Sequence, residues 1–94
     1  MKIVLDKEKA EQIAEEVAQL REEVEKTRRK YDEDRSSEFR RERFWRALNA
    51  EDEFLRALYI IGVVGVKWNG EMERQYAFDL DEALNAIEEK GGAK

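Results

Sequence analysis

A heptad repeat of apolar and small residues in the first third of the chain constrains the fold more than any other feature. Its positions recur at alternating steps of three and four residues, the spacing of a long amphipathic helix. They are Ala10, Ile13, Val17, Leu20, Val24, Thr27 and Tyr31. A helix over about 7–31, with Asp6 as its N-cap, would be roughly 37 Å long, whereas a compact domain of 94 residues has a radius of gyration of about 12 to 13 Å. Part of this helix must therefore protrude from the domain or pack against a partner.

Two interpretations of the heptad repeat are open. In the first, the repeat is a seam for self-association, because β-branched residues at the a positions and leucine at d favour a parallel two-stranded coiled coil. The chain would then be a homodimer held together by Ile13, Val17, Leu20 and Val24. In the second, the stripe packs against later helices of the same chain, because a chain this short has little other apolar surface from which to build a core.

The segments outside the heptad repeat predict further helices and one short strand. Residues 37–61 predict a helical pair, with the first helix over about 37–48 and the second one capped by Asn49. Residues 80–90 predict a terminal helix that is capped by Asp79 or Asp81 and closed by two glycines. Residues 2–5 predict either a short N-terminal strand or an apolar segment that leads into the first helix.

The period of the apolar residues changes from helical to alternating over residues 62–79, which predicts a β-hairpin. We expect a three-residue loop, Trp68–Gly70, that places Val66 opposite Met72 and Val64 opposite Arg74. This register is preferred because it keeps the apolar side chains on one face. Together the elements predict a single domain over residues 1–94, of the α+β class and mainly helical.

The expected order of long helix, two shorter helices, hairpin and helix looks like a winged helix with an extended first helix. Leu58–Gly65, with the sequence LYIIGVVG, runs into a hairpin that carries Tyr76 and Phe78. This stretch resembles the winged-helix tail segments of bacterial P-loop ATPases linked to defence. The resemblance covers residues 54–78 and implies a winged-helix-like fold. It transfers no site residues, because the chain has no ATPase motif.

A basic segment interrupts an otherwise acidic chain. Nine of the 18 lysines and arginines fall within residues 26–46, although the net charge of the whole chain is −5. The same segment carries Phe39, Phe44 and Trp45. Arginine and tryptophan are enriched at the centres of protein interfaces. The candidate partner-binding residues are therefore Arg40, Arg41, Arg43, Trp45 and Arg46.

Three explanations of this basic and aromatic segment are open. The aromatic residues can be core and the arginines a solvated face, or the segment can bind a protein partner with an acidic surface. It can also bind nucleic acid, with arginines on phosphates and Trp45 stacked on a base. The acidic start of the third expected helix, Asn49–Glu53, disfavours the insertion of that helix into a DNA groove. Exposure of Trp45 would favour an interface over a core role.

The residue types that are missing limit the chemistry. The chain has no histidine and no cysteine, so the commonest general base, metal ligand and thiolate nucleophile are absent. We therefore expect no catalysis, no metal site and no cofactor. No apolar run approaches the roughly 20 residues needed to cross a bilayer, so a cytoplasmic protein without membrane contact is expected.

The sequence predicts a non-catalytic protein-interaction module that associates with itself or with a larger protein. A nucleic-acid-binding winged helix is the alternative. A designed or engineered scaffold is a further alternative, because the chain has no proline and its first helix is written almost wholly in strong helix formers.

Overall fold

The heptad repeat forms one continuous helix in the computed structural model, which describes residues 2–70 and 75–92. This helix, α1 (Lys7–Glu33), ends two residues beyond the expected boundary. Asp6 is its N-cap, as predicted, because its carboxylate accepts a hydrogen bond of 2.8 Å from the backbone N–H of Lys9. Lys30 in the last turn complements the negative end of the helix dipole.

The second helix, α2 (Glu38–Ile60), is also continuous, so the predicted pair of helices over 37–61 is wrong. Ser37 is its N-cap and accepts a hydrogen bond of 3.2 Å from the N–H of Arg40. Asn49 lies inside the helix and caps nothing. Asparagine disfavours a helix interior by less than about 0.7 kcal/mol relative to alanine, and no glycine or proline interrupts this stretch. The helix therefore runs through Asn49, and the winged-helix arrangement is not established.

The predicted hairpin is present as an antiparallel pair, β1 (Val66–Trp68) and β2 (Tyr76–Phe78). Its register differs from the prediction, because Val66 pairs with Phe78 instead of Met72. Met72 and Arg74, the two partners that the predicted register required, lie outside the described residues. The pairing is shifted by six residues, an even number, so the apolar side chains still share one face of the hairpin.

Aromatic packing against α2 accompanies this register. The Trp68 and Tyr76 rings pair across the strands with centroids 5.2 Å apart, edge to face. Tyr76 also contacts Tyr59 of α2, with ring centroids 5.1 Å apart. A longer connection between the strands thus brings both hairpin aromatics into one cluster with α2, which the sequence pattern did not specify.

The N-terminal segment and the last helix are held at the end of the molecule opposite the turn between α1 and α2. Ile3 forms a single parallel bridge with Val63, and its N–H donates to the carbonyl of Gly62 at 2.7 Å, so the predicted N-terminal strand is reduced to one bridge. The last helix, α3 (Leu80–Gly92), is capped by Asp79, whose carboxylate accepts a hydrogen bond of 3.0 Å from the N–H of Glu82.

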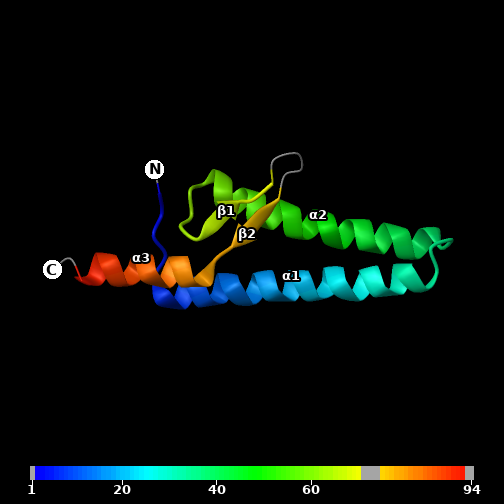
Figure 1. The fold of residues 1–94 in the computed structure, drawn as a ribbon, viewed down its shortest axis with the longest axis horizontal. Coiled ribbons are helices and arrows are strands. Elements are labelled where there is room, and N and C mark those ends of the chain that lie inside the picture. The colour runs from blue at the N-terminus through cyan, green and yellow to red at the C-terminus, as the bar shows by residue number, and fades with distance from the viewer. Residues whose placement is uncertain (1, 71–74, 93–94) are drawn as a thin grey trace.

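The three helices and the hairpin form an elongated, mainly helical α+β structure (Figure 1). α1 and α2 run antiparallel, α3 packs on α1, and the hairpin packs on α2. The overall dimensions are 59 × 26 × 15 Å. The radius of gyration of 15.9 Å exceeds the value of about 12 to 13 Å for a compact chain of this length, which confirms that part of the helical pair protrudes.

The heptad seam is occupied within the chain. Val17 is only 3% exposed, and Ile13, Leu20 and Val24 are half-buried where α1 packs on the other helices. The stripe thus packs within the chain, as in the second interpretation, and self-association through these four residues stays a prediction. The physical reason is the shortage of core, since the buried apolar side chains among residues 2–70 and 75–92 are few and mostly small. They are Ala10, Val17, Ala47, Leu55, Val63 and Ala83.

Candidate protein-interaction surface at the helical elbow

The elbow is the turn of residues 34–37 that joins α1 to α2, together with the helix ends beside it. Arg40 fastens the two helices, because its guanidinium donates a hydrogen bond of 2.8 Å to the backbone carbonyl of Lys30 and lies 3.4 Å from the Glu33 carboxylate. The Tyr31 and Phe44 rings stack with centroids 5.9 Å apart. Arg40, which the sequence predicts as a partner contact, therefore also joins the two helices within the chain.

The turn itself is held by short-range hydrogen bonds. The Ser36 hydroxyl donates to the Asp34 carboxylate at 2.6 Å, and this hydrogen bond holds the pKa of Asp34 below its ordinary value. Asp34 is solvent-exposed, so water and salt screen this interaction. The elbow is nevertheless a defined turn in which side chains and caps set the chain direction.

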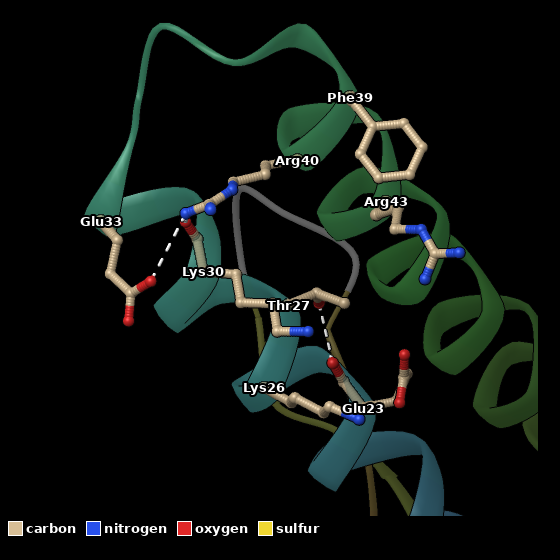
Figure 2. A pocket seen from close by; sticks show the side chains of 8 residues that line it. All are labelled: Glu23, Lys26, Thr27, Lys30, Glu33, Phe39, Arg40 and Arg43. Atoms are coloured by element: carbon tan, nitrogen blue, oxygen red, sulfur yellow. Dashed lines mark hydrogen bonds and ion pairs between the residues drawn. The ribbon is translucent and has the colours of Figure 1, made fainter.

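A groove opens between the two helices on one side of the elbow. It consists of two adjoining cavities of about 310 and 250 Å³ that share Glu23, Thr27 and Arg43. Figure 2 shows the side chains that surround the larger cavity, which come from both helices. We call this feature the tip groove. Its residues are Glu23, Lys26, Thr27, Lys30, Glu33, Phe39, Arg40, Arg43, Arg46 and Ala47.

Thr27 shapes the floor of the tip groove. It is buried, and its hydroxyl donates to the backbone carbonyls of Glu23 at 2.7 Å and Val24 at 3.1 Å. The polar atom is therefore satisfied within α1, as a buried hydroxyl must be. Because Thr27 and the buried Ala47 of α2 are both small, the floor of the groove stays recessed between the larger side chains on its rims.

The charges in the tip groove do not cancel. Glu33 is paired with Arg40, and Arg46 is paired with Glu42 at 2.8 Å. Within residues 2–70 and 75–92, no ion pair of 4 Å or less involves the three cations Lys26, Lys30 and Arg43, nor the carboxylate of Glu23. Three positive charges against one negative charge make the groove an attractive site for a carboxylate or another anion.

An exposed aromatic ring lies beside these cations. Phe39 is 66% exposed, and the guanidinium carbon of Arg43 lies 5.2 Å from the centre of its ring (Figure 2). This cation–π contact holds the Arg43 side chain near the groove. A phenyl ring with this exposure contributes little to the core, so the expectation that Phe39 could be a core residue is wrong.

Trp45 and Arg41 lie on the other flank of α2. Trp45 is 56% exposed, so it is not a core residue. On a helix, residues two positions apart differ in direction by roughly 200°, so Trp45 cannot share a surface with Arg43. Instead, Trp45 lines a separate hollow of about 490 Å³ with Arg21, Asp52 and Tyr76. The five predicted site residues thus divide between two surfaces.

The α1 half of the tip groove was missed in the sequence. Lys26 and Lys30 were counted in the basic segment, but they were not singled out as site residues. The turn at 34–37 was the usable signal. In an antiparallel helical pair, residues at similar distances from the turn lie side by side, which brings Lys30 next to Arg40.

Comparisons with protein-family models, with curated proteins and with solved structures find no match to this chain. Among the described residues, no group of three or more acidic side chains is placed to hold a metal ion. None of the described helices has the length and apolar character required to span a membrane. A function for this chain is therefore inferred from the geometry of the elbow.

Proposed function

We propose that the chain is a non-catalytic protein-interaction module that binds an acidic surface of another protein through the elbow. The observation that carries this proposal is the 66% exposure of the Phe39 side chain beside the cations of the tip groove. Exposed aromatic residues beside arginines are the composition of interface hot spots. The elbow also lies at the end of the molecule farthest from α3, where other elements do not hinder approach (Figure 1).

The occupied heptad seam makes a different protein the better partner than a second copy. A coiled coil between copies would have to separate α1 from α2 and expose Val17 and its neighbours. The elbow needs no such rearrangement, because its cations and Phe39 already face solvent. An acidic partner would gain favourable contacts there without unfolding the module.

Nucleic acid is the second candidate, because Lys26, Lys30 and Arg43 are available for phosphate and Phe39 for base stacking. Two observations disfavour it. Glu23 faces the same groove, and Glu42 neutralises Arg46. A backbone with a phosphate at every nucleotide would meet these carboxylates, whereas a protein surface can place its acids selectively.

The test compares two charge reversals that change the net charge equally. Lys30→Glu with Arg43→Glu alters the tip groove, and Arg29→Glu with Arg41→Glu alters exposed positions outside it. Titration calorimetry at 50 mM salt would measure binding of a twelve-residue Asp/Glu-rich peptide and of a twelve-residue oligothymidine. We expect the peptide to bind wild type and the control, and to lose at least tenfold in affinity to the groove variant.

Two results would overturn the protein-binding proposal. One is the absence of any peptide binding at 50 mM salt. The other is oligothymidine binding that is tighter than peptide binding and weakens steeply with added salt, which would assign the elbow to nucleic acid. Circular dichroism of each variant ensures that a loss of binding is not a loss of fold.

A further inference from the structure

The tip groove carries information about the partner beyond its charge. We propose that it recognises a two-part feature, an apolar side chain that packs on Phe39 and a neighbouring carboxylate that is held by Lys26, Lys30 and Arg43. This inference rests on the proposed function and specifies the partner as an acidic segment with at least one apolar residue. The remaining Trp45 flank is not needed for it.

The two rims of the tip groove each present a pair of side chains. Lys26 and Lys30 lie one helical turn apart on α1, and Phe39 and Arg43 lie one turn apart on α2, all lining the same cavity (Figure 2). One turn corresponds to about 5.4 Å, close to the distance between alternate side chains of an extended peptide or between residues one turn apart on a helix. The groove can therefore engage two side chains of one segment at the same time.

The aromatic part of the tip groove is already formed before a partner binds. The guanidinium of Arg43 lies 5.2 Å from the centre of the Phe39 ring, and the ring is still 66% exposed. An incoming apolar side chain can cover the exposed ring area, while Arg43 stays close enough to donate to a carboxylate on the same segment. Because the ring and the guanidinium already contact each other, fewer side-chain rotations are lost on binding.

The tip groove disfavours a ligand that carries a negative charge at every residue. Arg40 is already engaged by Glu33 and by the Lys30 carbonyl, so it is not available to a ligand without breaking those contacts. Glu23 lines the part that the two cavities share and has no ion pair among the described residues. A chain with a negative charge at every step would meet Glu23, whereas a segment with an isolated carboxylate and an apolar neighbour would not.

The volume of the cavity agrees with a ligand of this kind. About 310 Å³ is at the lower end of the range of small-molecule pockets and holds one or two side chains. The site is thus a receptor for a short feature on a partner, and the rest of the contact with that partner would lie outside the groove.

The experiment is a double-mutant cycle between the chain and a model peptide. Two twelve-residue peptides share the same Asp and Glu residues and differ at one central position, which is Leu in one peptide and Ser in the other. Each is titrated by calorimetry into wild type, Phe39→Ala and Trp45→Ala. We expect Leu→Ser to weaken binding to wild type and to Trp45→Ala by roughly five- to tenfold, and to have little effect on Phe39→Ala.

A second pair of variants tests the carboxylate subsite. Arg43→Gln should weaken binding of the Leu peptide, whereas Arg41→Gln, the same change on the other flank of α2, should not. Phe39 and both arginines are largely exposed, so these variants should keep the fold, and circular dichroism checks this.

The possible failures separate the two proposals. If the Leu and Ser peptides bind wild type equally while reversal of Lys30 and Arg43 abolishes both, the acidic-partner function stands and the two-part recognition is overturned. An equal effect of Leu→Ser on wild type and Phe39→Ala also overturns it. If neither peptide binds, both proposals fail. Concentration-dependent dimerisation that Arg43→Gln abolishes would mean that a second copy occupies the groove, which overturns the inference.

Discussion

At the scale of single residues, backbone geometry determines at which positions a substitution destabilises the fold. Gly62 and Gly65 have positive φ angles of 83° and 99°, a region that residues with a Cβ rarely adopt. At Gly65 a Cβ would also lie 2.8 Å from the backbone oxygen of Asp79 and 3.1 Å from the Ala83 side chain. At Gly65 the backbone therefore packs directly against the start of α3.

We expect Gly65→Ala to lower the free energy of unfolding by about 2 to 4 kcal/mol, because it combines an unfavourable φ with a clash against backbone. Gly62→Ala is the matched comparison, with a similar φ. Urea unfolding followed by circular dichroism would measure both variants. A smaller loss for Gly65→Ala than for Gly62→Ala would contradict the role assigned to the Asp79 contact.

The same region contains a charge network of Lys67, Asp79 and Glu82. This network predicts that the free energy of unfolding depends on pH. The N–H of Glu82 and the Lys67 ammonium, 3.2 Å away, hold the pKa of Asp79 below its ordinary value. Hydrogen bonds to Glu82 and Asp79 raise the pKa of Lys67. The stability that Asp79 contributes is present above its unfolded pKa of about 3.9 and is lost as pH falls through its lower folded pKa.

We expect wild type to lose more stability than Asp79→Asn between pH 5 and pH 2, since asparagine still caps a helix but does not titrate. At the alkaline end, the contribution of Lys67 is present below its unfolded pKa of about 10.4 and is lost as pH rises through its higher folded pKa. Urea unfolding at each pH is the measurement. Parallel curves for wild type and Asp79→Asn below pH 4 would count against the network.

At the scale of elements, α2 provides a test in which the sign of the effect is informative. An N-cap asparagine is stabilising, whereas an exposed asparagine inside a helix is less favourable than alanine. Because Asn49 is exposed and internal, we expect Asn49→Ala to stabilise the chain by about 0.5 kcal/mol. Ser37→Ala should instead destabilise it by about 1 kcal/mol, since Ser37 is the actual cap. A destabilising Asn49→Ala would indicate a helix boundary at that position.

The elements also show what could be read from the sequence. The heptad spacing and the Asp6 cap predicted α1 because both are local signals of helix period and start. An asparagine followed two residues later by a glutamate, as in Asn49 and Glu51, occurs both at the start of a helix and inside one. Only the tertiary packing of Leu55 and its neighbours decides which of the two forms. The predicted hairpin register was wrong for a similar reason, because the contact of Tyr76 with Tyr59 of α2 lies outside what the local pattern of the hairpin contains. The sequence predicted arginines on the α2 rim of the tip groove but not the lysines on the α1 rim, because the position of the α1 rim depends on how the two helices pair.

At the scale of the whole molecule, the extended shape and the packing of the heptad residues within the chain together predict the oligomeric state and the size in solution. We expect a monomer at micromolar concentration, with a radius of gyration in solution near the 15.9 Å of the Cα atoms. Sedimentation equilibrium and small-angle X-ray scattering would measure the two quantities. A dimer that Val17→Asp converts to unfolded chain at the same concentration would show that the seam holds copies together, because folding and association would then be one equilibrium.

The two tryptophans report on different parts of this molecule. Trp45 lies on the protruding helical pair and Trp68 in the hairpin, and both are partly exposed. In Trp68→Phe the remaining indole emission comes from Trp45 on α2 alone. In Trp45→Phe it comes from Trp68 in the hairpin alone. The chain therefore carries two built-in optical probes, one on α2 and one in the hairpin, and a change around either indole can be followed without an added dye.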